Sequence, residues 1–385
     1  QQKNNDITVE EGTVQKEHIE QVADFSYILL KNTAQYQKQD VLLSPLSAWL
    51  ALSMTGQGAK GETAAAFVRF FDGMAEADQK LLAAWLLQDL EGHLEGTTDI
   101  SLANSIWCDD EITVHTDFLQ SIQAYYRALV IKQDLQEKDA IKRVNGWIAK
   151  VTDNRIPVML DQIDQDAVML LMNALTLEAK WQIPFNSSNT YKDTFYRADG
   201  SEITQEFMHQ AYQEADYLQW EQGEGIVLPY DDGRLAMVPA AESDYHVLLE
   251  QLSGSWMKEQ LEHQQKRMIQ LSIPKFEMNS QLNLNDVCTA MGLEIAFDAK
   301  RADFAGLGTS IKGAICIGRV LQNCQLKVGE EGTEAAAATV VEMVAEGAAR
   351  EPEDLVMLNL NRPFVYLILD QQTQIPLFAG IYQGE

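Results

Sequence analysis

The stretch from residue 330 to residue 352 constrains the fold of this 385-residue chain more than any other. Its odd-numbered and even-numbered residues differ in character. From Thr333 to Ala345 one parity carries no charge, whereas Glu334, Glu342 and Glu346 all share the other. A strand points successive side chains to opposite faces, so the segment could be buried on one side and solvated on the other. Its alanines are poor strand formers and good helix formers, and the pattern therefore predicts a segment that occupies two different environments.

The rest of the chain predicts long helices first and strands later. Residues 167–181 form a long, nearly uninterrupted apolar run with one polar residue, Asn173, that we expect to be buried, and this run predicts a central strand covered on both faces. Residues 315–328 predict the strand that leads into the 330–352 segment, and residues 282–291 predict a helix. No linker or repeat divides the chain, which indicates a single α+β domain built on antiparallel sheets.

Charge and cysteine usage exclude several classes of partner. The chain has 57 acidic against 29 basic residues, a net charge of −28, and such a surface repels phosphate backbones. No apolar run reaches the roughly 18 residues that a membrane helix needs. The four cysteines show neither a zinc spacing nor a disulfide framework and predict core thiols. We therefore expect no nucleic acid, no membrane span and no metal.

Enzyme motifs are missing or misplaced in this sequence. Residues 56–61 match G-x-G-x-x-G, but they follow a predicted helix and not a strand, which fails the test for a dinucleotide site. None of the six histidines lies in H-E-x-x-H, and there is no G-x-S-x-G elbow. We expect no catalytic activity and no cofactor.

Several segments, in order, carry a resemblance to one family. Residues 332–339 resemble the hinge of the reactive loop of inhibitory serpins, which are serine protease inhibitors. The matching segments elsewhere are 44–47, 58–63, 173–181, 273–276, 302–307, 361–364 and 376–380. The resemblance covers the chain from about residue 20 to the end.

The resemblance implies a serpin-like α+β fold. It would have three mostly antiparallel β-sheets, about eight or nine helices and an exposed reactive loop at about residues 332–352. Residues 1–17 would be a flexible segment and residues 18–385 a single domain. We expect a monomer, extracellular or at the cell surface, whose signal segment has been removed. Heparin is not expected, because Lys80 is the one lysine or arginine in the predicted helix of residues 75–93, where some serpins bind heparin.

The resemblance also assigns roles to residues. In inhibitory serpins a protease cuts the loop, forms an acyl-enzyme and is trapped when the loop inserts into the main sheet. The hinge would comprise Glu330, Gly332, Thr333, Glu334, Ala335, Ala336, Ala337, Ala338 and Thr339. The shutter and breach of the sheet would comprise Ser44, Ser47, Asn173, Trp181, Lys275 and Gln322. Gln322 stands where many serpins have a histidine, and an amide cannot become charged.

The position of the cut is predicted from family spacing. Counting from Glu330 places the scissile bond after Glu346, give or take one residue. Val344 and Ala345 suit the shallow apolar pocket of elastase-like proteases, so we expect such a protease as the covalent partner, with cleavage at one of these residues. Arg350 would suit a trypsin-like protease instead. The remaining alternative is a non-inhibitory serpin that acts as a chaperone or carrier.

Overall fold

The computed structural model describes residues 7–10, 12–93, 96, 98–163, 167–311, 313–333 and 355–384. These residues form nine α-helices and three β-sheets, and most strand pairs are antiparallel, so the predicted fold class is confirmed. The helices are α1 (Lys16–Tyr36), α2 (Pro45–Gly56), α3 (Gly61–Phe70), α4 (Glu76–His93), α5 (Thr116–Tyr126), α6 (Ala140–Val151), α7 (Tyr245–Gln251), α8 (Gly254–Glu262) and α9 (Asn285–Cys288).

The strands are concentrated in the second half of the chain. They are β1 (Val41–Leu43), β2 (Asp99–Cys108), β3 (Ile112–Val114), β4 (Leu129–Lys132), β5 (Met169–Lys180), β6 (Thr190–Tyr196), β7 (Glu202–Gln219), β8 (Gly223–Pro229), β9 (Leu235–Glu242), β10 (Gln265–Pro274), β11 (Phe276–Asn283), β12 (Gly308–Ser310), β13 (Arg319–Val328), β14 (Gly332–Thr333), β15 (Leu355–Asn359), β16 (Phe364–Asp370) and β17 (Pro376–Tyr382).

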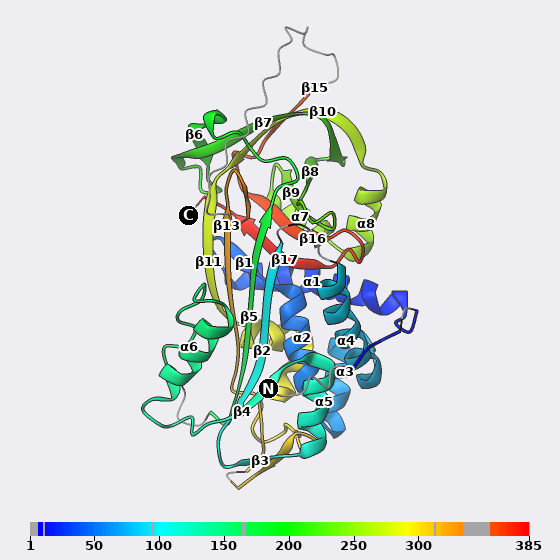
Figure 1. Ribbon diagram of the computed structural model, residues 1–385, viewed down its shortest axis with the longest axis vertical. Coiled ribbons are helices and arrows are strands. Elements are labelled where there is room, and N and C mark those ends of the chain that lie inside the picture. The colour runs from blue at the N-terminus through cyan, green and yellow to red at the C-terminus, as the bar shows by residue number, and fades with distance from the viewer. Residues whose placement is uncertain are drawn as a thin grey trace.

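The main sheet has six strands in the order β11-β13-β14-β5-β2-β4 and runs along the long axis of the molecule (Figure 1). Its central strand, β5, is buried on both faces because its residues alternate between two cores. Leu171 and Leu175 pack into the larger core with α2, whereas Leu170 and Met172 pack with Val144 of α6. This double burial explains the continuous apolar run in the sequence.

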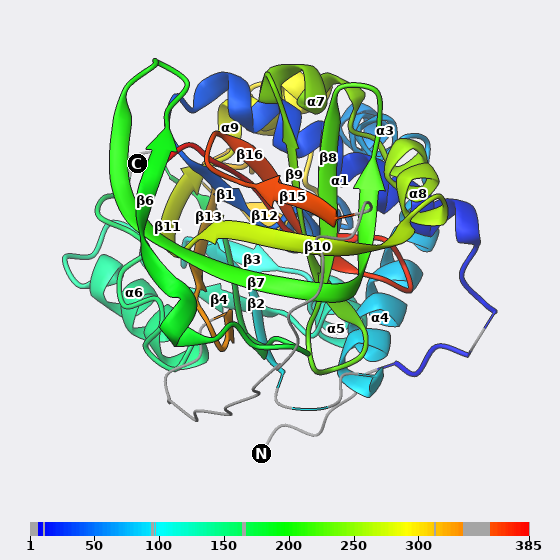
Figure 2. The same ribbon diagram turned by 90° about the horizontal axis from the view of Figure 1, so that it is seen from above.

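The second sheet has nine strands, β1-β17-β16-β9-β8-β7-β10-β15, with β6 paired to β7. Seen from above, β7 and β10 cross the top of the molecule, with α6 on one side and α1, α3 and α8 on the other (Figure 2). The third sheet is the pair β3–β12. The second sheet therefore covers the upper end of the main sheet, next to Thr333, the last described residue before the 334–354 segment.

Helix α2 is positioned by its first residues. The Ser44 side chain accepts a hydrogen bond from the Ser47 backbone N–H, and Pro45 occupies the first turn, where its missing N–H costs nothing. All twelve residues of α2 are buried. This helix end places the backbone of Ser44 and Ser47 beneath the centre of the main sheet.

The helix expected over residues 282–291 begins a few residues later in the structure. Strand β11 runs through Leu282 to Asn283, α9 covers Asn285–Cys288, and a π-helical turn continues it over Thr289–Leu293, where Gly292 has a positive φ of 99°. Pairing of β11 with β13 overrides the helical pattern at Leu282 and Asn283. Within the expected flexible segment, Val9 is 4% exposed and exchanges backbone hydrogen bonds with the Gln88 side chain.

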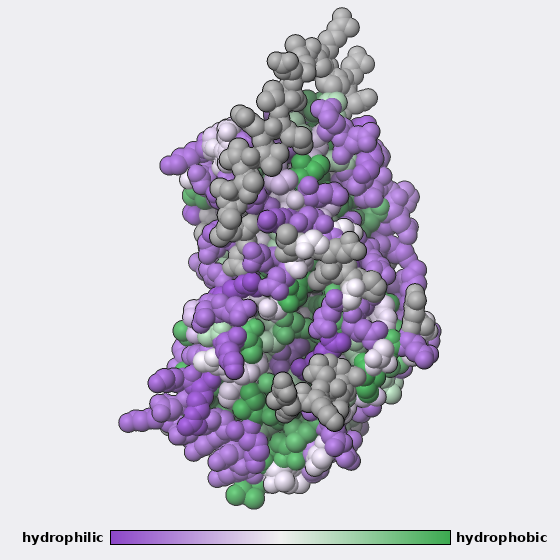
Figure 3. All heavy atoms as spheres, in the orientation of Figure 1, coloured by the Kyte–Doolittle hydropathy of each residue, from purple (hydrophilic) through white to green (hydrophobic). Residues whose placement is uncertain are grey.

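The surface in Figure 3 is mainly hydrophilic, and hydrophobic side chains gather in its lower half. All four cysteines are free, and Cys108, Cys288 and Cys324 are buried, as expected for core thiols. Among the described helices, none is both long and apolar enough to cross a membrane.

Candidate functional site

The site is a gap at the upper end of the main sheet, between β5 and β13. Strand β14 enters this gap and pairs antiparallel with both neighbours, Thr333 with Ala179 of β5 and with Val328 of β13. Lower down, β13 and β5 pair directly with each other in parallel, from Arg319 opposite Leu170 to Cys324 opposite Leu175. The first two residues of a new strand are therefore already in place where the sheet is split.

Gly332 is required by the close approach of β14 to β5. A Cβ atom at this position would lie 2.1 Å from the carbonyl oxygen of Ala179, and backbone cannot give way as a flexible side chain can. The glycine at position 332 is thus explained by packing against β5.

Thr333 is fully buried and is held by Tyr230. The two hydroxyls lie 2.6 Å apart, and the Tyr230 ring stacks on Trp181 with centroids 4.6 Å apart. Trp181 in turn donates from its indole N–H to the Gly329 carbonyl at 2.8 Å and from its backbone N–H to the Glu331 carbonyl at 2.9 Å. The two rings hold the turn that leads into β14.

Lys275 and Glu330 form an ion pair at the top of this site. Lys275 Nζ lies 3.0 Å from Glu330 Oε2, and the side chains are 35% and 17% exposed. Burial alone would raise the pKa of the Glu330 carboxyl, but the hydrogen bond and charge of Lys275 hold it below its ordinary value. The pair joins the end of the second sheet to the start of the turn before β14.

A hydrogen-bonded cluster lies lower in the sheet, where β13 and β5 are in contact. Gln322 accepts from the Ser44 N–H at 2.9 Å, and its amide donates to the Ser44 carbonyl at 2.8 Å and to Asn173 Oδ1 at 3.0 Å. Asn173 donates to the Ser47 carbonyl at 2.9 Å and to Asn104 Oδ1. These side chains join β13, β5 and β2 to the start of α2.

The structure therefore places the expected site residues in two groups along the boundary between β5 and β13. Glu330, Gly332, Thr333, Trp181 and Lys275 lie together at its top, and Ser44, Ser47, Asn173 and Gln322 lie below them. The other expected hinge and reactive-site residues lie outside the described residues: Glu334, Ala335, Ala336, Ala337, Ala338, Thr339, Val344, Ala345 and Glu346.

Two members of these groups were missed in the sequence. Asn104 shares a parity with Ile100, Leu102 and Ile106 in β2, so a polar residue on an apolar face was the available signal. Tyr230 lies beyond the end of β8 and meets Thr333 across 103 positions of sequence. No local pattern indicates that contact.

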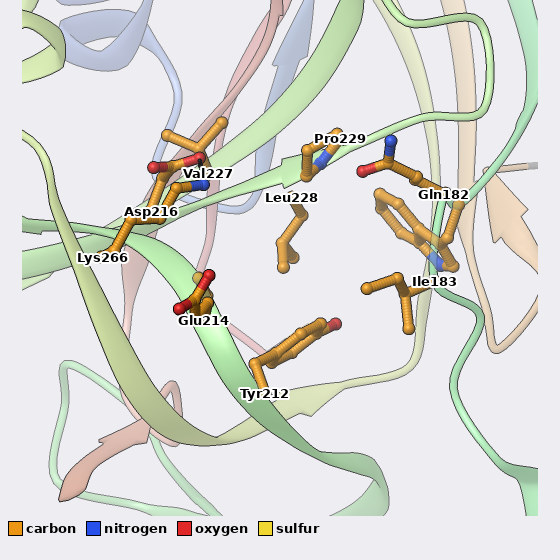
Figure 4. A pocket seen from close by; sticks show the side chains of 11 residues that line it. Gln182, Ile183, Tyr212, Glu214, Asp216, Val227, Leu228, Pro229 and Lys266 are labelled. Atoms are coloured by element: carbon orange, nitrogen blue, oxygen red, sulfur yellow. Dashed lines mark hydrogen bonds and ion pairs between the residues drawn. The ribbon is translucent and has the colours of Figure 1, made fainter. Parts of the chain in front are cut away.

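A small cavity of about 60 Å³ lies beside Trp181 (Figure 4). Tyr212 and Ile183 form part of its wall, and Lys266 and Asp216 at its edge form an ion pair of 2.8 Å. A cavity of this volume is too small for an organic substrate, and its lining residues include no histidine or cysteine.

Comparisons with known proteins agree with this geometry. The sequence model of the serpin family (serine protease inhibitor) matches residues 20–383. An uncharacterized serpin-like protein of Thermococcus kodakarensis is 26% identical, over 95% of this chain and 85% of the relative. Serpin A9 of Mus musculus is 27% identical, over 92% of this chain and 86% of the relative.

Solved structures show the same fold. The native state of the thermophilic serpin tengpin superposes with a TM-score of 0.90 at 30% identity, over 99% of this chain and 97% of that one. Thyroxine-binding globulin in complex with thyroxine gives a TM-score of 0.83 at 21% identity, over 95% of this chain and 98% of that one. Because the family match spans nearly the whole chain, the protein belongs to the serpin family.

Proposed function

We propose that the protein is an irreversible suicide-substrate inhibitor of serine proteases, most suited to an elastase-like enzyme. The observation that carries the proposal is the position of Thr333, which is fully buried between β5 and β13 as the first inward residue of a new strand. The residues that follow it keep small, uncharged side chains at the inward parity as far as Ala345.

The pairing of the sheet supports continued insertion. A strand that follows β14 down the gap would run antiparallel to both β5 and β13, and it would replace one parallel pair by two antiparallel pairs. Antiparallel pairing is slightly more stable per residue. About 14 inserted residues at about 3.3 Å each would carry an attached protease on the order of 45 Å.

Opening the gap has an identifiable cost. The 3.0 Å hydrogen bond between Gln322 and Asn173 joins β13 to β5 and must break as the strands separate. In the proposed mechanism, this hydrogen bond helps to keep the main sheet closed until cleavage frees the segment. This is the behaviour required of an inhibitor that acts only after attack.

The preferred cut lies at Val344 or Ala345, with Ala345 slightly favoured. Small apolar residues before the cut suit an elastase-like pocket, whereas Glu346 suits few serine proteases. Cleavage at Arg350 by a trypsin-like enzyme would leave about four extra residues, roughly 13 Å of slack at strand rise. A trypsin-like enzyme cutting there should therefore mostly turn over the protein.

A catalytic function has less support. Ser272 Oγ lies 3.1 Å from His209 Nε2, which resembles part of a hydrolase triad, but among the described residues His209 Nδ1 contacts the backbone oxygen of Asn189 and not a carboxylate. Ser272 is also only 6% exposed. Burial raises the pKa of the Cys108 and Cys288 thiols to about 12, which makes them poor nucleophiles.

A carrier function is the second candidate, since thyroxine-binding globulin shares the fold. A carrier has no need of small inward residues after its hinge, and this chain has them. A serine protease target also makes an extracellular or cell-surface location part of the proposal. A monomer suffices, because both edges of the gap belong to one chain.

The test is incubation with pancreatic elastase, trypsin and a glutamate-specific protease, followed by a denaturing gel. We expect a band with elastase near the summed masses and mass-spectrometric release of a carboxy-terminal fragment starting at Glu346 or Ala345. Complete turnover by all three enzymes would favour the carrier. A stable trypsin complex with a fragment starting at Glu351 would move the reactive bond to Arg350.

A further inference from the structure

A second pocket, of about 550 Å³, opens beside β15, the strand that follows the 334–354 segment. The β7–β8 hairpin forms one wall, the end of β9 another, and Met357 and Asn359 of β15 a third. Strand β15 lies at the same end of the molecule as β7 and β10 (Figure 1). A protease that binds the 334–354 segment must therefore lie close to this pocket.

The lining of the pocket is acidic. Its charged residues are Glu221, Glu224, Glu242 and Arg362, which give a formal charge of −2. Arg362 is exposed, and among the described residues no ion pair joins it to the three glutamates. Among the described residues, these carboxylates therefore have no ion-pair partner, and the pocket offers them to a further cation.

Two of these carboxylates are held in place by aromatic side chains. Tyr217 donates its hydroxyl to Glu224 Oε2 at 2.5 Å, and Trp220 donates its indole N–H to Glu242 Oε2 at 2.9 Å. The Trp220 ring packs edge-on against Trp256. A Cβ atom at position 223 would lie 2.4 Å from the Trp220 ring, which explains why this position is a glycine. Aromatic walls with fixed carboxylates suit a guanidinium or ammonium group.

Glu242 lacks part of its hydrogen bonding. It is 3% exposed, and its second oxygen, Oε1, has no partner among the described residues. An unpaired acceptor in a buried carboxylate costs free energy, and a cationic donor that approached from the pocket would remove that cost. The unpartnered oxygen thus supplies an observation independent of the acidic lining.

We propose that this pocket receives a lysine or arginine side chain from the surface of the protease that attacks the 334–354 segment. The identity of the partner rests on the proposed inhibitory function, whereas the cation preference rests on the pocket alone. The net charge of −28 favours encounter with basic proteases, and the pocket would give that encounter a fixed docking point. Arginine is favoured over lysine, because its planar donors match carboxylates and stack on aromatic rings.

The cation preference is tested on the intact protein without any protease. The Trp220 indole N–H signal is followed by NMR during titration with N-acetyl-arginine methylamide or with its neutral isostere, N-acetyl-citrulline methylamide. We expect a saturable shift with the arginine compound only, and its loss in Glu242→Gln, which keeps an acceptor for Trp220. Equal shifts with both compounds, or none, would overturn the proposal.

The docking role is tested by the rate of covalent complex formation with an elastase-like protease of basic surface at low salt. We expect Glu242→Gln to lower the association rate constant about tenfold, as for loss of one charged hydrogen bond, with unchanged inhibition stoichiometry. Arg362→Gln should raise the rate, and Glu202→Gln, an equal charge change at the far end of β7, should leave it near wild type. If Glu242→Gln and Glu202→Gln behave alike, the docking role is wrong.

Absence of any covalent complex with the wild type would refute the proposed function instead. The NMR titration would still show whether the pocket prefers a cation.

Discussion

Gln322 shows how one side chain can determine whether separation of β13 from β5 depends on pH. It both accepts from and donates to the backbone of Ser44 while it donates to Asn173 across the β13–β5 boundary. An amide fills these roles without a titratable proton. We therefore expect separation of the two strands to be independent of pH between 5 and 8 as far as this cluster is concerned.

Replacement of Gln322 by histidine should introduce a pH dependence. A neutral imidazole can accept from the Ser44 N–H and donate to Asn173, but a protonated ring can no longer accept. The folded state then favours the neutral form, so stability should fall as the pH drops through about 6.5, the ordinary histidine pKa. Urea unfolding at pH 8.0 and 5.5 measures this. An equal loss at both pH values would mean that the substitution acts by packing alone.

The Lys275–Glu330 pair gives a second prediction at the level of single residues. Because the pKa of Glu330 is lowered in the folded state, its contribution is present above its ordinary pKa of about 4.3 and is lost as the pH falls through the lowered value. Lys275→Gln should cost about 1 kcal/mol or less at pH 7, since the pair is partly exposed. The cost should vanish in acid, below the folded pKa of Glu330. A cost that is the same at pH 7 and in acid would contradict this account.

Strand β14 is the element on which the proposed inhibition would depend. Thr333→Arg places a charge where the native side chain is fully buried and bonded to Tyr230, and a buried unpaired charge costs several kcal/mol. We expect this variant to fold, because only the end of the sheet is disturbed, and to be cleaved by elastase without a covalent complex. Thr333→Ser keeps the hydroxyl and should retain the complex. Full complex yield with the arginine variant would refute the role of Thr333.

The elements that could be predicted from the sequence are those with a repeating local pattern. The apolar run of β5 and the parity of the segment after Glu330 were both visible in the chain. The pairing of β5 with β13 was not visible, because parallel register is decided by residues about 150 positions apart. The contact of Tyr230 with Thr333 was hidden for the same reason. Leu282 was assigned to a helix because its pairing with Gln322 is also distant in sequence.

At the scale of the whole molecule, the main sheet has room for a longer strand between β5 and β13. Two strands that would gain antiparallel neighbours are paired in parallel, and the strand that could separate them stops at Thr333 in the described part of the chain. Under the proposed function, a break in the 334–354 segment would let a strand enter between β5 and β13 and give both of them antiparallel neighbours. Thermal stability reports the difference directly.

Cleavage of that segment should make the protein more heat-stable. An added strand of about 14 residues forms new hydrogen bonds of roughly 1 kcal/mol each, so unfolding should cost about 10 kcal/mol more, and Tm should rise on the order of 10 °C for a chain of this size. Calorimetry of intact and elastase-cleaved protein measures this. Cleaved Thr333→Arg is the control, and it should gain little, because its first inward residue resists burial. If cleaved and intact wild type melt together, the segment does not insert, and the carrier function becomes the better account of the fold.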